Sequence, residues 1–353
     1  MRVQCISLLR CPVTGSKLNL QVISTVSERY GSEIEQVIHE GILFAEKDWF
    51  FPIIDGIPRM LVESFLDYQD FLEKHLSDFV IRKNQLMAKY GDFVRAVVKK
   101  NRRTKESFAL EWSVYDYGND KTWNAQGPEI FERFLKETDE TAESLHDKAV
   151  FDMGCGNGYL SHLIAHNSRF VVAMDFSTSV ERAKKAGRSC NILFVQGDIE
   201  FSPIQESHFD IVQCSGVLIC TTDSELSFNR IATNVKIGGK LSVWLYHPRK
   251  NVIHNFFNWL RKYLSRLPLK LEYYVLMTTI FPASYVFKKL TGNKQNVREM
   301  IVDILDWFTP EFRWEHSPEE ASSWFGRLNY TSVKVTTTDT FGFNMTGTRM
   351  DYK

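Results

Sequence analysis

The sequence predicts an α/β fold with a doubly wound, mostly parallel sheet at its centre. Three observations support this prediction. Apolar runs of strand length recur between residues 148 and 247, segments of helical periodicity alternate with them, and glycine-rich or polar turns separate the two kinds of segment. A series of strand–helix units of this kind builds a parallel sheet with right-handed crossovers.

The composition is that of an ordinary globular chain without a global charge. The 353 residues are 44% hydrophobic, and 43 basic residues balance 43 acidic ones. This length accommodates one large domain and a smaller one. Because the net charge is zero, no overall field attracts nucleic acid, so we expect no general nucleic-acid binding. Assembly into an oligomer stays open.

The cysteines and apolar segments bear on the compartment. The six cysteines form no Cys-x-x-Cys pair, which indicates reduced thiols. The N-terminal apolar stretch is short and is interrupted by Arg10, so no targeting segment is predicted. The longest apolar stretch, residues 269–281, is shorter than the roughly 20 residues that span a bilayer. We therefore expect a cytoplasmic protein without a transmembrane segment.

The first strand–turn–helix unit lies at residues 148–165, KAVFDMGCGNGYLSHLIA. Its apolar run ends at Asp152 and passes through Gly154, Gly156 and Gly158 into a helical segment. Glycine permits positive φ and lets a ligand approach the backbone closely. A dinucleotide-binding turn has its third glycine three positions after its second, where this chain has tyrosine. The turn is therefore predicted to bind a cofactor other than NAD, although a tight turn without a ligand is the simpler alternative.

A second carboxylate follows at an informative distance. Residues 169–175, RFVVAMD, form a predicted strand that ends in Asp175, 21 positions after Gly154. An acid about 20 positions along binds ribose hydroxyls in βαβ nucleotide sites. Asp175 could instead cap the next helix. Its coincidence with the glycine turn favours the ribose role.

Three further strands complete the predicted series, at residues 191–196, 210–214 and 240–246. Before the last of them, Thr222 and Glu225 have the spacing of a capping box, and a helical face continues as far as Val235. Ligands of open α/β sheets bind at the carboxyl ends of the strands. The residues at those ends are therefore candidate ligands.

Together these motifs resemble those of class I S-adenosylmethionine (SAM)-dependent methyltransferases, over most of residues 107–346. The resemblance implies a Rossmann-like sheet of seven strands, with SAM as cofactor. It places the methionine end of SAM at the glycine turn and the adenine at Gly197-Asp198-Ile199. The implied cofactor-binding residues are Asp152, Gly154, Cys155, Gly156, Gly158, Asp175, Phe176, Gly197, Asp198, Ile199, Cys214 and Ser215.

One departure from the resemblance concerns the acceptor side. After the fourth strand, relatives often read GVLHHT, whereas this chain reads GVLICT, with Ile219 and Cys220 in place of two histidines. No role of those imidazoles can be transferred to this chain. A different acceptor or a different base is therefore expected.

An aromatic stretch, residues 107–124 (SFALEWSVYDYGNDKTWN), precedes the glycine turn. It has no clean period, which by itself favours a packed loop. It also resembles the segment that forms part of the cofactor lid in methyltransferases with a similar N-terminal module. Aromatic faces attract a sulfonium cation by about 0.5 to 2 kcal/mol. Trp112 and Trp123 are accordingly candidate cofactor-binding residues.

The chain divides into a small β-rich module at residues 1–62, a helical connector at 63–105 and a catalytic domain at 106–353. The module contains CPVT and ends in FPIIDGIPRML. It thereby resembles the zinc-ribbon-like domain of the family that activates tRNA and protein methyltransferases. Thr14 stands where a second cysteine ligand belongs, and no cysteine pair follows before Cys155. A structural zinc site needs about four ligands, so we expect no metal.

An insertion at about residues 248–307 follows the fifth strand. It is too long for an ordinary loop, and its aromatic residues have helical spacing. It could cover the sheet as a surface hairpin, close over an acceptor pocket as a cap, or lie on a membrane surface. The cap is favoured because the insertion starts at the carboxyl end of a strand.

The leading functional hypothesis is a SAM-dependent methyltransferase for a small-molecule or sugar-containing acceptor. The alternatives are a tRNA or protein methyltransferase and a non-catalytic SAM-binding sensor; zero net charge disfavours the RNA version. A hydroxyl acceptor needs a base. His247, directly after the fifth strand, is the candidate base, Tyr246 is a candidate wall or hydrogen-bond donor, and His316 could reach the pocket from the other side.

Overall fold

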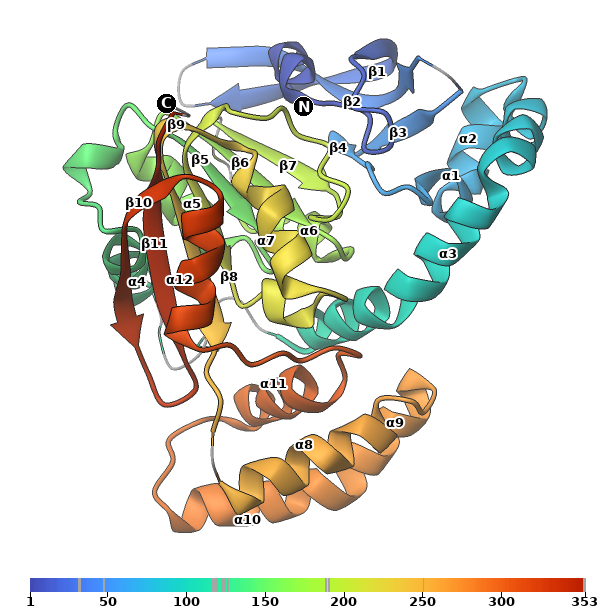
Figure 1. The fold of residues 1–353 in the computed structure, drawn as a ribbon. Coiled ribbons are helices and arrows are strands. Elements are labelled where there is room, and N and C mark those ends of the chain that lie inside the picture. Colours follow the sequence, from blue (N-terminus) through green and yellow to red (C-terminus); the bar gives the residue numbers. More distant parts are fainter. Residues whose placement is uncertain are drawn as a thin grey trace.

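The computed structural model describes residues 1–30, 33–46, 48–115, 120–121, 125, 127–187, 189, 191–249 and 251–351. Within these residues the chain forms a small sheet, a larger central sheet and a helical insertion (Figure 1). The small sheet lies at one end of the molecule and the insertion at the other, with a long helix running along one side.

The central sheet has seven strands in the described part of the chain, in the order β10-β11-β9-β8-β5-β6-β7. The five strands from β9 to β7 in this order are parallel, whereas β11 is antiparallel to β9 and to β10. The predicted fold class, a doubly wound and mostly parallel sheet, is therefore confirmed. The strands are β5 (Ala149–Met153), β6 (Phe170–Asp175), β7 (Ile192–Gln196), β8 (Phe209–Ser215), β9 (Val235–Tyr246), β10 (Tyr330–Thr338) and β11 (Gly342–Arg349).

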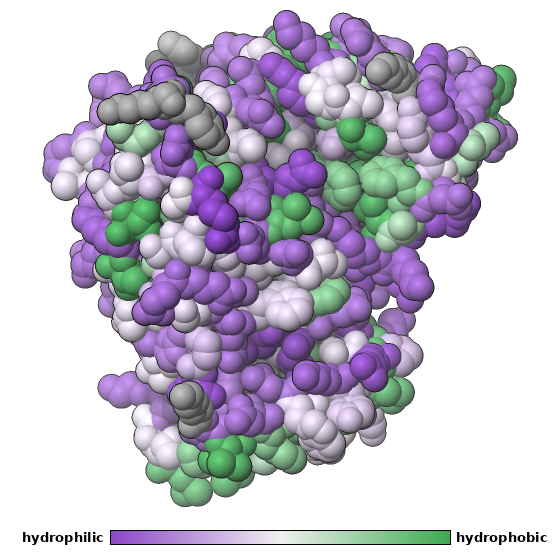
Figure 2. All heavy atoms as spheres, in the orientation of Figure 1, coloured by the Kyte–Doolittle hydropathy of each residue, from purple (hydrophilic) through white to green (hydrophobic). Residues whose placement is uncertain are grey.

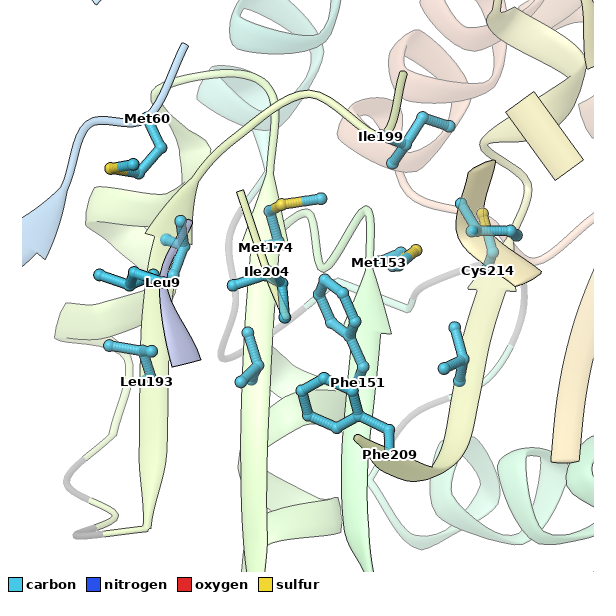
Figure 3. Packing of buried hydrophobic residues seen from close by; sticks show 14 of the residues in the cluster. Leu9, Met60, Phe151, Met153, Met174, Leu193, Ile199, Ile204, Phe209 and Cys214 are labelled. Carbon is cyan, nitrogen blue, oxygen red and sulfur yellow. The ribbon is translucent and has the colours of Figure 1, made fainter. Parts of the chain in front are cut away.

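Alternate side chains of the buried strands supply two separate cores, because successive residues of a strand point to opposite faces. Val150 and Val171 pack with residues of α4, α5 and α6. Phe151 and Val172 belong to the larger core, which includes residues of α7, α12 and the N-terminal module (Figure 3). The helices around the sheet are α4 (Pro128–Thr138), η2 (Glu143–Leu145), α5 (Tyr159–Asn167), α6 (Ser179–Lys185), η3 (Leu218–Cys220), α7 (Ser224–Ala232) and α12 (Pro318–Arg327).

The N-terminal module is an antiparallel sheet of four strands among the described residues, preceded by a short 3-10 helix. Its elements are η1 (Val3–Leu8), β1 (Leu18–Tyr30), β2 (Glu33–Ala45), β3 (Phe50–Ile54) and β4 (Ile57–Pro58). It covers β7, the edge strand of the central sheet: the Met60 N–H donates to the Gln196 carbonyl at 2.7 Å. Leu9 lies beside Ile204 in the shared core (Figure 3). The predicted β-rich module is thus present, while its kinship with zinc ribbons stays a prediction.

The connector consists of α1 (Ser64–Asp67), α2 (Gln69–His75) and the long helix α3 (Phe79–Val114). The last helix continues beyond the predicted connector and absorbs the first half of the aromatic stretch, which we expected to be a loop. Contacts with the insertion account for the extension. Arg103 donates to the carbonyls of Thr309 and Leu267, and the Ser107 and Thr309 hydroxyls are 2.5 Å apart.

The insertion is helical, as predicted, and we call it the cap. It comprises α8 (Val252–Leu264), α9 (Leu269–Val275), the π-helix η4 (Leu276–Ile280), α10 (Phe281–Leu290) and α11 (Val297–Phe308). An apolar cluster centred on Leu276 and Leu305 packs the cap against Leu110 and Val114 of α3. Within the described residues, no helix combines the length and the apolarity that crossing a bilayer requires.

Two predicted boundaries around α7 are wrong. The helix begins after Asp223, whose carboxylate accepts the Leu226 N–H at 2.9 Å, because the hydroxyl of Thr222 donates to Glu200 instead. The helix also ends at Ala232, and Val235 is already the first residue of β9. The Asn234 side chain, which donates to two backbone carbonyls, anchors this early turn.

Candidate functional site

A cavity of about 1210 Å³ lies where the strand ends of the central sheet face the cap. One part is lined by residues at or just after the ends of β5, β6, β7 and β8, and another part by residues of α8, α10 and α11. The predicted site residues that line it are Trp112, Asp152, Gly154, Cys155, Asp175, Phe176, Gly197, Asp198, Ile199, Ser215 and Tyr246. The topology thus brings most of the predicted residues to one place.

The other predicted site residues lie elsewhere. Gly156, Gly158, Cys214 and His247 are not among the described residues that line the cavity, and Trp123 lies outside the described residues. Gly156 and Gly158 still belong to the turn that shapes the cavity wall, and Cys214 is fully buried in β8. Their roles stay predictions.

All three glycines of the turn have positive φ, at +76° for Gly154, +51° for Gly156 and +70° for Gly158. The prediction that these positions need glycine is therefore confirmed. The atoms that approach the turn most closely belong to side chains of the protein itself. A Cβ on Gly154 would lie 2.2 Å from Val217, and one on Gly156 would lie 2.5 Å from the Trp112 ring. The turn is packed tightly against the helix that carries Trp112.

Asp175 joins the end of β6 to the glycine turn. Its Oδ2 accepts the Gly156 N–H at 2.8 Å, and its Oδ1 accepts both the N–H and the hydroxyl of Ser177 at 2.8 Å. A carboxylate offers about four acceptor positions. One is therefore left for a ligand hydroxyl, and a bidentate bond to ribose requires one internal bond to open.

The other two strand-end acids are buried and partly satisfied. The Ser161 hydroxyl donates to Asp152 at 2.5 Å, and Asp198 accepts from the Asn101 amide at 2.8 Å. Burial raises the pKa of each carboxyl to about 6. Both groups are thus poised to ionise when a positively charged or hydrogen-bonding ligand arrives.

Glu111 is the site residue that sequence reasoning missed. It lies on α3, it is fully buried, and neither carboxylate oxygen has a hydrogen-bond partner among the described residues. Burial raises the pKa of this carboxyl well above its usual value, and the charges of Asp306 and Asp175 add to the effect. The available signal was the helical spacing from Ser107 to Glu111, which we interpreted as part of a loop.

Tyr246 faces the cavity from the end of β9. Its hydroxyl is 2.9 Å from Asp306 Oδ2, and the Arg313 guanidinium lies 3.9 Å from the ring centroid. Burial, with the Asp306 charge second, raises the pKa of this phenol well above its usual value. Tyr246 is therefore a neutral hydrogen-bond donor in the cavity wall.

The rings of His247 and His316 have their hydrogen-bond partners outside the described cavity wall. His247 is partly exposed, and its ring Nδ1 lies 3.3 Å from the Pro248 carbonyl. His316 is buried, with Nδ1 at 2.9 Å from Glu320. The structure therefore gives neither histidine a place in the described cavity wall, and a catalytic role for His247 stays a prediction.

The cavity is strongly acidic. Among the described lining residues, nine are Asp or Glu and three are Lys or Arg. Such a wall favours a ligand with positive charge, because an opposite charge within about 4–6 Å stabilises an ionised carboxylate. SAM carries an ammonium and a sulfonium group. The strand-end acids and the Trp112 ring thus form a set that fits this cofactor.

Residues 145–298 match a family model described as a methyltransferase domain. This segment is a methyltransferase domain with the class I, SAM-binding fold. It begins just before β5 and ends at the start of α11, so it contains the glycine turn, Asp175, Asp198 and most of the cap.

Individual proteins show more distant similarity. A ubiquinone biosynthesis O-methyltransferase of Coxiella burnetii is 34% identical over 101 residues, which cover 28% of this chain and 43% of that protein. An uncharacterized methyltransferase of Mycobacterium tuberculosis is 29% identical over 100 residues, which cover 28% of this chain and 51% of that protein. The chain thus spans about half the length of the curated relatives it matches.

Among solved structures, the magnesium protoporphyrin IX methyltransferase of Synechocystis with bound SAH is 15% identical to this chain. The alignment covers 71% of this chain and 99% of the other, with a TM-score of 0.41. Because the sequence identity and the TM-score are this low, the fold assignment depends on the strand order of the present chain.

Proposed function

We propose that this chain transfers a methyl group from SAM to a hydroxyl group of a small molecule. The observation that carries the proposal is the shared cavity, in which the strand-end acids face an unpartnered, buried carboxylate beneath the cap. The O-methyltransferase named among the relatives supports a hydroxyl acceptor. The zero net charge of the chain argues against a tRNA substrate.

The strand-end half of the cavity would hold the cofactor. Asp175 would bind a ribose hydroxyl, Asp198 with Ile199 would contact the adenine, and Asp152 with the glycine turn would bind the methionine end. Trp112 would cover the cofactor from α3. When bound, SAM supplies a methyl carbon on a positively charged sulfur, and transfer to a hydroxyl leaves S-adenosylhomocysteine and a released proton.

Glu111 would accept that proton. A general base works best when its pKa lies near the operating pH, and burial moves the pKa of Glu111 in that direction. Tyr246, whose hydroxyl donates to Asp306, would form part of the wall against which the acceptor packs. Positioning of the two reactants in one cavity contributes the rest of the rate enhancement.

Calorimetry tests the cofactor assignment. We expect SAM to bind and NADH not to bind. Asp175→Ala should weaken SAM binding at least tenfold, because a charged hydrogen bond contributes about 1.5–3 kcal/mol. Asp175→Asn, which keeps the shape of the side chain, separates lost charge from a disturbed turn. Tight NADH binding without SAM binding would overturn the assignment.

The acceptor and the base are tested together. Incubation with methyl-deuterated SAM and a metabolite extract should produce a compound that carries the labelled methyl group. With that compound in hand, Glu111→Gln should lower turnover by roughly 10²–10⁴-fold and leave SAM affinity nearly unchanged. Glu106→Gln, an exposed residue on the same helix, is the matched control. If His247→Ala loses turnover and Glu111→Gln does not, the base is His247 as the sequence predicts.

A further inference from the structure

We infer that the cap docks on an anionic membrane surface and that the cavity receives a lipophilic acceptor from the bilayer. The docking part stands on the surface of the cap alone, whereas the acceptor part rests on the proposed function.

The outer side of the cap is unusually apolar. On α8, Val252, Phe256, Trp259 and Tyr263 recur at helical spacing and are each more than half exposed. The opposite side of α8 packs inward, where His254 and Arg261 are buried. Figure 2 shows hydrophobic side chains gathered at the end of the molecule where the cap lies. Since exposed apolar patches of this kind mark interaction sites, the stripe needs a partner.

Two more cap helices present exposed apolar side chains. They are Leu271 and Tyr274 on α9, and Val286, Phe287 and Leu290 on α10. The most exposed of them, Leu290, has 83% of its surface accessible. The apolar surface therefore belongs to the cap as a whole and not to one helix.

The charge of the cap identifies the partner. Residues 252–308, which span the cap, contain eight Lys or Arg and four Asp or Glu, in a chain whose net charge is zero. Of these acids, Glu272 is buried and pairs with Arg103 of α3, and Asp303 pairs with Lys288. Several of the cations are exposed, and no ion pair to the following ones occurs among the described residues: Lys262, Arg266, Lys270 and Lys294.

Apolar side chains flanked by cations are the combination that binds the interface of an anionic bilayer. A second copy of this chain is a poorer occupant, because two caps that each carry a net positive charge would repel each other. The partner is therefore an anionic lipid surface.

The cavity opens toward this surface. Ile253 and Phe287 both line the cavity, and each is about two-thirds exposed, at 66% and 68%. They come from α8 and α10, the two helices that carry the most exposed apolar residues of the cap, Val252 and Leu290. A molecule dissolved in the bilayer could thus enter the cavity between apolar side chains without crossing water.

Vesicle flotation with the full chain, without SAM or acceptor, tests the docking. We expect binding to vesicles that contain phosphatidylglycerol and weak binding to phosphatidylcholine alone, with a strong decrease at high salt. Each cation near an anionic surface strengthens binding about fivefold, so Lys262→Gln with Arg266→Gln should weaken it about 25-fold. Phe256→Ser with Trp259→Ser should weaken it at least tenfold.

Matched controls come from α3, which lies outside the cap. Val80→Ser with Ile81→Ser removes two equally exposed apolar residues, and Arg95→Gln with Arg102→Gln removes two exposed cations. Neither control should change vesicle binding. Absence of binding to anionic vesicles, or equal losses in controls and cap variants, would overturn the inference. So would light scattering that shows a dimer which Phe256→Ser with Trp259→Ser dissociates.

The experiments can refute either proposal without refuting the other. If the protein binds SAM and methylates a water-soluble compound but binds no vesicles, the proposed function stands and the membrane inference falls. If it binds anionic vesicles but not SAM, the docking stands and the function falls. If both hold, the labelled product should appear in the lipid fraction of the extract, and a product confined to the aqueous fraction would refute delivery from the bilayer.

Discussion

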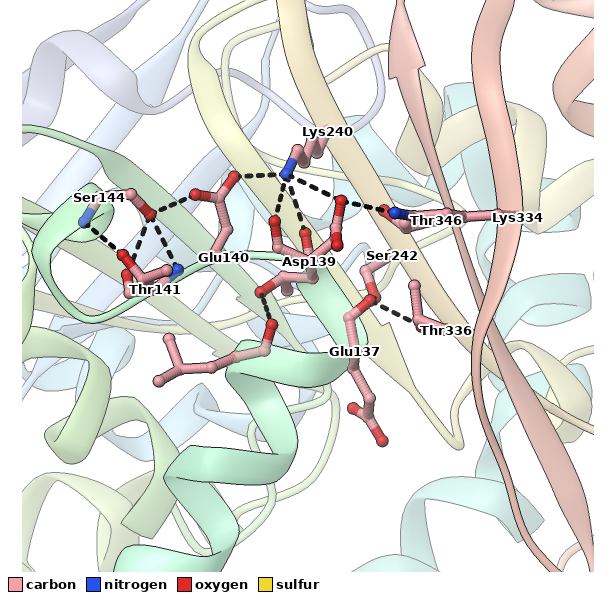
Figure 4. A network of polar contacts seen from close by, with 12 residues as sticks. Glu137, Asp139, Glu140, Thr141, Ser144, Lys240, Ser242, Lys334, Thr336 and Thr346 are labelled. Carbon is pink, nitrogen blue, oxygen red and sulfur yellow. Dashed lines mark hydrogen bonds and ion pairs between the residues drawn. The ribbon is translucent and has the colours of Figure 1, made fainter.

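Glu137 illustrates how burial sets the chemistry of a single residue. Its carboxyl group lies in the cavity wall with only 4% of the residue exposed, and burial raises its pKa to about 7. Its backbone carbonyl has a separate structural role, because it accepts hydrogen bonds from Ser242, Thr336 and Asn344 (Figure 4). The side chain can therefore be changed without breaking this network.

Glu137→Gln should stabilise the protein at pH 8 but not at pH 4. The raised pKa means that the folded state keeps its proton while the unfolded state loses it. The associated stability is present below about pH 4.5 and is lost as the pH rises to about 7. Glutamine cannot ionise, so the variant escapes a loss of up to about 3 kcal/mol.

Urea unfolding of both proteins at the two pH values measures this difference. Glu132→Gln, on the exposed side of the same helix, should change the free energy of unfolding by the same amount at both pH values. An equal effect of Glu137→Gln at pH 4 and pH 8 would show that folding does not raise the pKa of this carboxyl.

At the scale of elements, the glycine turn depends on its neighbours as much as on its own backbone. Val217 follows β8 and occupies the space beside Gly154, and Trp112 of α3 occupies the space beside Gly156. A side chain at either position would therefore displace an element distant in sequence. Gly238 in β9 offers a comparison, since its φ is +77° and no heavy atom lies within 4 Å of the place that a Cβ would occupy.

Gly154→Ala should cost roughly 2–5 kcal/mol of unfolding free energy, from the strain of positive φ together with overpacking. Gly238→Ala should cost only the backbone strain, about 1–2 kcal/mol. Chemical denaturation compares the two, and Val217→Ala should restore part of the loss in the Gly154→Ala background. Equal losses at both glycines would mean that packing at the turn contributes nothing.

Polar contacts also tie elements together around the sheet edge. Lys240 of β9 pairs with Glu140 at 2.8 Å and donates to the backbone carbonyl of Asp139 at 2.6 Å (Figure 4). Asp139 in turn pairs with Lys334 of β10. The end of α4 is thus fixed to two strands, which positions the cavity-facing residues of that helix.

In the whole molecule, the N-terminal module folds as one unit with the central sheet. Its Phe50 and Met60 share one core with Phe151 of β5. Arg59 is almost fully buried and pairs with Glu181 of α6 at 2.9 Å. The module thereby protects the edge strand β7, which would otherwise expose unpaired backbone groups.

Deletion of residues 1–62 should therefore lower the soluble yield and cause aggregation, since it uncovers both apolar surface and a strand edge. Expression of the truncated and full chains, followed by size-exclusion chromatography, checks this. A monomeric truncated protein with unchanged unfolding would contradict it.

The absence of zinc stays a prediction. Among the described residues, no three His, Cys, Asp or Glu side chains form a group that could hold a metal ion. Elemental analysis of untagged protein tests this prediction, and one zinc per chain would refute it.

Local patterns in the amino-acid sequence were sufficient to predict the order of strands and helices and most of the strand-end residues. Periodicity and turn glycines are local signals, and parallel strands carry their ends to one edge of a sheet, so Asp152, Asp175 and Asp198 could be placed together in advance. The length of the insertion likewise indicated a cap.

What covers that edge of the sheet could not be predicted from local patterns. Glu111 enters the cavity because contacts with the cap extend α3, and the described wall includes Tyr246 but not the next residue, His247. Nor does sequence spacing reveal that Trp112 packs on Gly156. These outcomes depend on contacts between residues far apart in the chain, and local patterns carry no information about which distant side chain fills a given space.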